Sequence, residues 1–202
     1  MAARPFVPAS FVLGPTLLAV AASAACNIDP VHTNAVNALG PEVGGIPQGE
    51  FHRAGQPCTT CHGDEGPAKS SFTIGGTVFY GPANTAAPVG VGNVSVTLED
   101  DSGSQFTTTT NCVGNFWVSP GDWPGHPQFP VLVTISGTPA GSYLQQSMQS
   151  HIGRQGSCAA CHQIPNSDNL FETPGVVHLS GTDDPNFAGD QSCAVSPVLR
   201  AH

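Results

Sequence analysis

Two five-residue stretches carry the residue types and spacing with the clearest chemistry, C-T-T-C-H at 58–62 and C-A-A-C-H at 158–162. In each stretch two thiols stand three positions apart, and a histidine directly follows the second thiol. Thiols at this spacing add to the two vinyl groups of one haem, and the adjacent imidazole reaches the haem iron. The sequence therefore predicts two covalently bound haem c groups. The thioether donors would be Cys58, Cys61, Cys158 and Cys161, and the proximal iron ligands His62 and His162.

Zinc binding and thiol redox chemistry are the alternative interpretations of these motifs. A structural zinc site takes four ligands, whereas the two motifs together offer four thiolates and two surplus histidines. A thioredoxin-like thiol pair is typical of a βαβ pattern, and neither motif lies in one. Covalent haem is the favoured interpretation, with the other two left open.

The paired motifs resemble those of multihaem c-type cytochromes. The resemblance implies an electron carrier rather than an enzyme, with redox proteins, themselves multihaem cytochromes, as partners. The sequence differs from mono-haem cytochromes and dihaem peroxidases, which are mostly helical. Haem peroxidase activity is the catalytic alternative.

The distal iron ligands are sought among the remaining histidines and the methionine. His52 and His151 precede their motifs by six and seven residues, so each lies on the approach to its own motif. We expect each to reach over the neighbouring haem, with His151 ligating the first haem and His52 the second. His126, His178 and Met148 are the alternatives.

Met148 is the one methionine outside the first 25 residues, so at most one haem takes His/Met ligation. Ser142 is expected to cap a short helix running to His151, which would place Met148 and His151 on one face. Bis-histidine ligation of the other haem implies a low-potential carrier. Arg53 and Arg154 lie near the motifs and are expected to pair with haem propionates.

Residues 1–25 are typical of a signal peptide, with Arg4, an apolar run over 11–22 and small residues before the cleavage site. The sequence Ser-Ala-Ala-Cys ending at Cys26 resembles a bacterial lipobox, although Ser23 replaces the usual leucine. Lipidation of Cys26 and ordinary signal cleavage both stay open. The chain is expected in the periplasm, anchored at the outer membrane, or on the surface of a Gram-negative bacterium.

Two further cysteines, Cys112 and Cys193, are expected to form a disulfide in an oxidising compartment. Without the leader, four cations face fourteen acidic residues, a formal charge of −10. Such a surface repels nucleic acid and anionic membrane, so we expect membrane contact only through a lipid at Cys26.

The middle of the chain predicts a small β-sandwich over 72–140. Val94, Val96 and Leu98 alternate with polar residues, as on a strand with one buried face. The expected strands cover 72–80, 91–99, 105–110, 114–118 and 129–136. Gly76-Thr77-Val78, residues 88–98 and residues 107–116 resemble the carboxypeptidase regulatory-like domain, except that Cys112 occupies its variable turn. The resemblance implies a prealbumin-type sandwich acting as a non-catalytic scaffold or adhesion module.

The expected organisation is a mainly-β protein whose Ig/prealbumin-like sandwich is flanked by loop-rich haem-binding segments with short helices. Residues 26–71 form a linker and the first haem-binding segment, and 141–202 the second segment and a tail. The predicted function is an exported dihaem cytochrome c. The alternative is an envelope binding or structural protein that uses haem for sensing or assembly. Assembly into a homo-oligomer stays open.

Overall fold

The computed structural model describes residues 29–42, 46, 48–81, 88–139, 141–164 and 173–179. The predicted leader, Cys26 and Cys193 lie outside the described residues. No helix within those ranges is long and apolar enough to cross a membrane.

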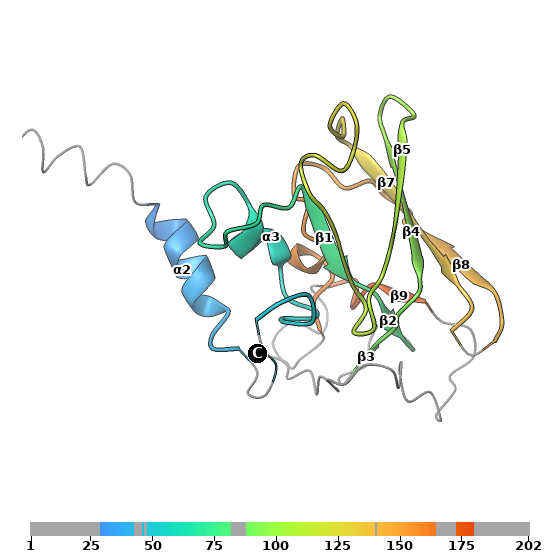
Figure 1. Cartoon of the computed structure of the whole chain (residues 1–202), viewed down its shortest axis with the longest axis horizontal. Coiled ribbons are helices and arrows are strands. Elements are labelled where there is room, and N and C mark those ends of the chain that lie inside the picture. Colours follow the sequence, from blue (N-terminus) through green and yellow to red (C-terminus); the bar gives the residue numbers. More distant parts are fainter. Residues whose placement is uncertain are drawn as a thin grey trace, which may run out of the picture.

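One layer of the fold is a four-stranded antiparallel sheet with the strand order β5-β4-β7-β8 (Figure 1). Its inner strands are β4 (Ser95–Asp100) and β7 (Val131–Gly137), and its edges are β5 (Gln105–Thr109) and β8 (Leu144–Ser147). Val96 and Leu98 of β4 are fully buried, whereas Thr97 and Glu99 are not. The alternation that predicted this strand therefore marks its core face.

The facing layer is built from shorter strands. Strand β1 (Ile74–Thr77) pairs antiparallel with β6 (Asn115–Val118). Strand β2 (Phe79–Tyr80) pairs with β3 (Val89–Gly90) on one side and, in parallel, with β9 (His178–Leu179) on the other. The C-terminal part of the described chain therefore returns to the sandwich after the second motif.

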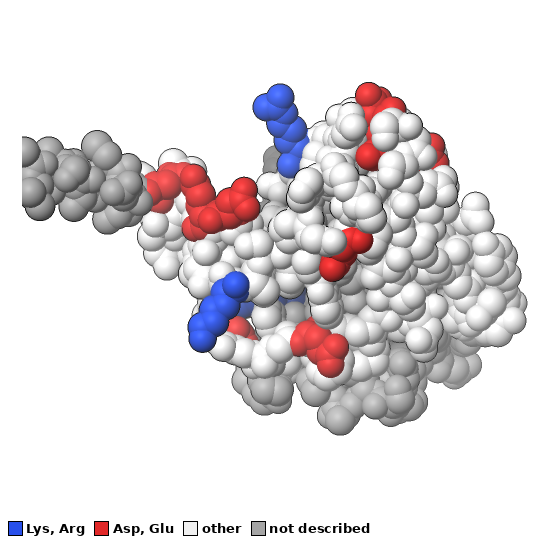
Figure 2. Space-filling model, turned by 45° about the horizontal axis from the view of Figure 1, so that its top comes forward, with Lys and Arg blue, Asp and Glu red and all other residues white. Residues whose placement is uncertain are grey.

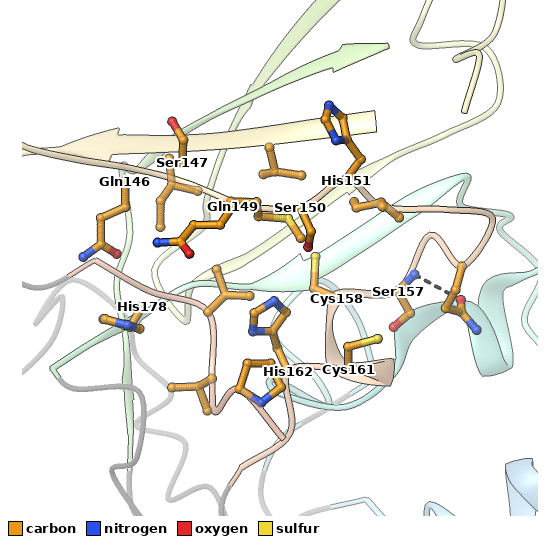
Figure 3. Close-up of a pocket in the computed structure, with 18 of the residues that line it drawn as sticks. Gln146, Ser147, Gln149, Ser150, His151, Ser157, Cys158, Cys161, His162 and His178 are labelled. Carbon is orange, nitrogen blue, oxygen red and sulfur yellow. Dashed lines mark hydrogen bonds between the residues drawn. The ribbon is translucent and has the colours of Figure 1, made fainter. Parts of the chain in front are cut away.

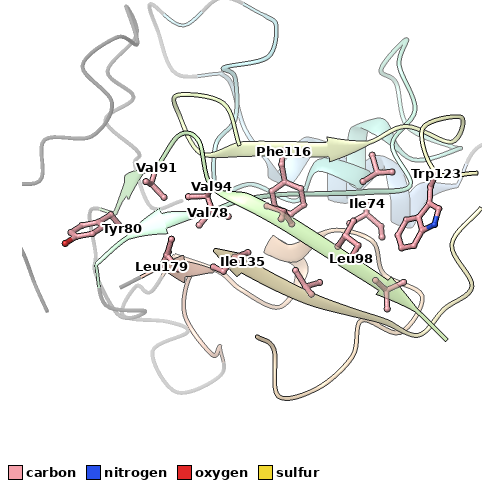
Figure 4. Close-up of a cluster of buried hydrophobic side chains, with 14 residues drawn as sticks. Ile74, Val78, Tyr80, Val91, Val94, Leu98, Phe116, Trp123, Ile135 and Leu179 are labelled. Atoms are coloured by element: carbon pink, nitrogen blue, oxygen red, sulfur yellow. The ribbon is translucent and has the colours of Figure 1, made fainter. Parts of the chain in front are cut away.

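The hydrophobic core lies between these layers (Figure 4). Ile74 and Phe116 from one layer meet Leu98 and Ile135 from the other, and all four side chains are buried. Trp123 closes one end of the core and donates a hydrogen bond from its indole nitrogen to Ser104 Oγ at 3.0 Å. The mainly-β prediction is confirmed. The likeness to the carboxypeptidase regulatory-like domain stays a prediction.

The helix expected between Ser142 and His151 is wrong. Residues 144–147 form β8, which pairs with the edge of β7, and Leu144 and Gln146 alternate in burial with their neighbours. Pairing with an available sheet edge outweighs the weak local helical preference of this segment. With β8 and β9, the sheets extend past residue 140, where the sequence placed the end of the sandwich.

Within the described ranges the helical elements are α2 (Pro30–Ala38), α3 (Cys58–His62) and the 3₁₀ turn η1 (Cys158–Ala160). Helix α2 forms within a segment that lacks helical periodicity. Asp29 caps it by accepting a hydrogen bond from the Val31 amide at 2.8 Å. Both α3 and η1 contact β1, so the two C-x-x-C-H motifs lie against the same strand of the sandwich (Figure 1).

Candidate haem-binding site

The first motif folds as the single helical turn α3, which brings Cys58 and Cys61 to one face. The chain then wraps back over the turn. The Gly63 amide donates to the Thr59 carbonyl at 2.8 Å, and the Ala68 amide donates to the Cys61 carbonyl at 3.0 Å. This loop carries Ser70 and Phe72 over His62.

Ser70 orients His62 through two oxygen atoms. The Nδ1 atom of His62 lies 2.8 Å from the Ser70 carbonyl oxygen and 3.0 Å from the Ser70 hydroxyl. Because a carbonyl only accepts, the bond to it requires the proton on Nδ1, and in the neutral ring Nε2 then keeps a free lone pair. That is the form of histidine that binds a metal, and a carbonyl partner on the other nitrogen is typical of metal-ligating histidines.

The second motif repeats this arrangement with different elements. It forms the turn η1, and Nδ1 of His162 lies 2.9 Å from the Gly175 carbonyl oxygen. The Thr173 hydroxyl donates to the Cys161 carbonyl at 2.8 Å and so ties the segment before β9 to the motif. His62 and His162 thus present the same donor atom although their supporting residues lie far apart in the sequence.

A cavity of about 580 Å³ opens beside the second motif (Figure 3). This volume lies within the range of about 300–1,000 Å³ that small-molecule and cofactor pockets occupy. Cys158, Cys161 and His162 line it together with the three candidate distal ligands Met148, His151 and His178. Phe116, Val133, Ile135, Val176 and Val177 form an apolar wall, and glutamine and serine side chains, among them Gln146 and Ser150, line the rest. The donor set and the apolar wall fit a covalently attached haem.

The candidate ligands of this cavity differ in how they face it. In Figure 3 the ring of His151 points away from Cys158 and His162, and His151 is exposed. His178 is held in β9 and by a hydrogen bond with the Gly81 backbone. Burial, followed by the neighbouring His162, lowers the pKa of His178 and favours its neutral form.

His52 lies beside the histidine of its own motif, with ring centroids of His52 and His62 5.8 Å apart. Its Nδ1 accepts a hydrogen bond from the Gly49 amide at 3.1 Å, so in the neutral ring Nε2 carries the proton. Burial is the main cause that lowers the pKa of His52. Ligation through Nε2 would require the bond with Gly49 to break.

The crossed arrangement of distal ligands is not what the structure brings together. His52 lies at the first motif and His151 lines the cavity of the second, so each is next to its own motif. Asn115 holds His52 at the first motif, because the Nδ2 atom of Asn115 donates to the carbonyls of Glu50 at 3.2 Å and His52 at 3.1 Å. This anchor is 63 residues away from His52 along the chain.

Arg53 joins the first motif's segment to the end of α2, and its expected contact with a haem propionate stays a prediction. Its guanidinium donates to the carbonyls of Gly40 at 2.9 Å and Leu39 at 3.4 Å, at the C-terminal end of α2, and it lies 3.7 Å from Glu42. Uncapped carbonyls at a helix end attract such a cation. Its φ of 50° is in the left-handed region.

Cys58 and Cys61 are both half-buried, whereas in the second motif Cys158 is half-buried and Cys161 is exposed. Burial is the main cause that raises the pKa of Cys58 to about 11 and that of Cys158 to about 12.

Cys112 is disulfide-bonded. Its predicted partner, Cys193, lies outside the described residues.

No described group of three or more His, Cys, Asp or Glu side chains is arranged to hold a bare metal ion. Acidic side chains are scattered over the face shown in Figure 2, with few basic ones among them.

Comparison of the chain with protein-family models, with curated proteins and with solved structures gave no match. A functional assignment therefore depends on the chemistry of the site.

Proposed function

We propose that this protein is an exported dihaem cytochrome c that carries electrons between redox proteins. The observation that carries the proposal is the matched pair of motifs. In both motifs the histidine that ends the C-x-x-C-H turn donates a hydrogen bond from Nδ1 to a backbone carbonyl. Two unrelated loops produce the same donor geometry, which agrees with iron ligation by Nε2 at both places.

The chain's residues would hold the cofactor and adjust its environment. Cys58, Cys61, Cys158 and Cys161 would form the thioethers. The Ser70 and Gly175 carbonyls orient the proximal imidazoles and make them more basic. When bound, haem supplies a single-electron carrier, taking one electron from a donor protein and passing it to an acceptor. The apolar wall of the cavity would limit access of water to this centre.

For the sixth iron ligands we assign His178 at the second motif and His52 at the first. His178 is fixed in a strand and lies in the same cavity as His162. The ring of His52 lies 5.8 Å from that of His62, measured between centroids. To bind iron through Nε2, His52 must give up the hydrogen bond that its Nδ1 accepts from the Gly49 amide. Export and redox partner proteins belong to this proposal because of the sequence, and lipidation of Cys26 stays open beside ordinary signal cleavage.

The experiment is a haem count on protein from a host with cytochrome c maturation. We expect two covalent haems per chain by the pyridine haemochrome assay and low-spin optical spectra. The variant with Cys58→Ala and Cys61→Ala should retain one haem, and so should the matched variant at Cys158 and Cys161. Protein that carries no covalent haem would refute the proposal.

A further inference from the structure

Two consecutive glycines of β1 stand between the two haem motifs. A Cβ atom added at Gly75 would lie 3.2 Å from Cβ and 3.4 Å from Sγ of Cys58. One added at Gly76 would lie only 2.6 Å from Sγ of Cys158. Neighbouring residues of a strand face opposite sides, so the two thiols rest on the two sides of one strand.

The closeness of the motifs has independent support. The Thr59 hydroxyl of the first motif donates to Oε1 of Gln155 at 2.9 Å, and the same oxygen accepts from the Ser157 amide beside the second motif. The Gly75 amide donates to the Gly156 carbonyl at 2.9 Å. Cys58 also contributes to the raised pKa of Cys158, although burial is the larger cause.

These contacts limit the distance between the attachment points. Consecutive Cα atoms are about 3.8 Å apart and a Cα–Cβ bond is about 1.5 Å long, so the Cys58 and Cys158 sulfur atoms are at most about 13 Å apart. Each thioether places an edge of its haem one bond from the sulfur. The two cofactor edges would then be held near each other by the protein backbone itself.

Glycine is an unfavourable residue in a buried strand, because it loses more conformational freedom on folding and fills no space. Gly75 and Gly76 are both buried. At Gly76 any side chain would meet the Cys158 sulfur and the ring of Phe116, at 2.6 Å and 3.1 Å. The pair therefore allows two attachment turns to approach one strand closely.

We propose that Gly75 and Gly76 set the separation of the two haem sites, so that the oxidation state of one haem shifts the potential of the other. This inference rests on the proposed function. The glycines are positioning residues, since they act through the cysteines. Close charges interact more strongly than distant ones, which makes the shift sensitive to this separation.

The test compares the two-haem protein with the two single-haem variants, which lack either the Cys58/Cys61 or the Cys158/Cys161 pair. Each is titrated potentiometrically and examined by electron paramagnetic resonance when oxidised. We expect the two-haem protein to show potentials and ferric signals that differ from the sum of the single-haem proteins. Equality with that sum would overturn the inference while two covalent haems would still uphold the proposed function.

The glycines are tested with Gly76→Ala, with Gly75→Ala as the milder change. Gly121→Ala is the matched control, because an added Cβ there meets no atom within 4 Å. The separation of the two potentials should change in Gly76→Ala, change less in Gly75→Ala, and keep its wild-type value in Gly121→Ala. A wild-type separation in a Gly76→Ala protein that carries two haems would refute the positioning role. If Gly76→Ala does not fold, Gly75→Ala decides by the same criterion.

Discussion

The imidazole of His62 stacks on the phenyl ring of Phe72, with ring centroids 4.1 Å apart and 9° between the planes. Phe72 in turn stacks on Trp117 of β6 at 5.7 Å. The imidazole of His62 is therefore oriented at its edge by the Ser70 carbonyl and on its face by the ring of Phe72, which packs on the sandwich. Ring stacking and the carbonyl bond together leave the imidazole little freedom to rotate.

Phe72→Ala should loosen this histidine. Replacing a buried phenylalanine with alanine costs about 3–5 kcal/mol, and because Phe72 is half-buried we expect about 1–3 kcal/mol of unfolding free energy. The spectrum of the first haem should shift from low-spin toward mixed spin, while that of the second stays unchanged. Urea unfolding and optical spectra of the one-haem variants measure both effects, with Phe72→Leu as the conservative control.

His178→Ala should open the second iron to external ligands. We expect the second haem to bind carbon monoxide in this variant and not in the wild type. His151→Ala and Met148→Leu change other residues of the same cavity and are the matched controls. If one of the controls binds carbon monoxide and His178→Ala does not, the residue changed in that control is the sixth ligand and His178 is not.

Arg53→Ala should release α2 from the first haem segment. Hydrogen bonds to a charged group contribute about 1.5–3 kcal/mol each at most, and the half-buried pair with Glu42, at 3.7 Å, adds little. We expect a loss of about 1–2 kcal/mol and faster hydrogen exchange of the α2 amides. Arg154→Ala removes an exposed cation next to the other motif and should leave α2 exchange unchanged.

Asp100 makes the β4–β5 hairpin sensitive to acid. Its Oδ1 accepts hydrogen bonds from the Ser102 hydroxyl at 2.6 Å and the amides of Ser102 and Ser104, and its Oδ2 accepts from the Gln128 amide. The bond from the Ser102 hydroxyl is the main cause that lowers the pKa of Asp100. Since the folded pKa lies below the unfolded value of about 3.9, the stabilisation is complete above about pH 4 and is lost as the pH falls further.

Asp100→Asn tests this relation through urea midpoints measured from pH 7 down to pH 3. We expect the variant to be less stable than the wild type at pH 7, and the difference to shrink below about pH 4 as the wild-type carboxylate takes up its proton. A difference that stays constant across this range would show that charge on Asp100 does not matter.

Local patterns in the sequence predicted several strands and turns of the fold. The alternation around Val96 and the turn residues of the hairpin predict β5 and most of β4, because each strand shows its buried face within a few residues, but β4 begins at Ser95 and not at Val91. The motif turns are equally local. In contrast, β8 forms on the edge of β7 and β9 pairs with β2 across about a hundred residues. Neither pairing leaves a sign in the strand's own composition.

The candidate site likewise has features that the local sequence predicts and features that depend on distant parts of the chain. Cysteine spacing indicates the attachment points, whereas the partners of the two histidines depend on where loops return. Ser70 and Gly175 contribute only backbone carbonyls, for which side-chain chemistry gives no signal. Consecutive glycines in a strand-like run do suggest a close approach, but which residues approach Gly75 and Gly76 follows only from the tertiary structure.

The parallel pairing of β9 with β2 has a consequence for the order in which the molecule is built. During synthesis the first motif precedes every strand it packs against, and the second motif gains its contacts with Thr173 and Gly175 only when the segment that ends in β9 has been made. Pairing across so long a stretch of chain slows folding, because a long loop must close before the contact forms. A chain truncated before β9 would contain both motifs but would lack the contacts of Thr173 and Gly175 that hold the second one.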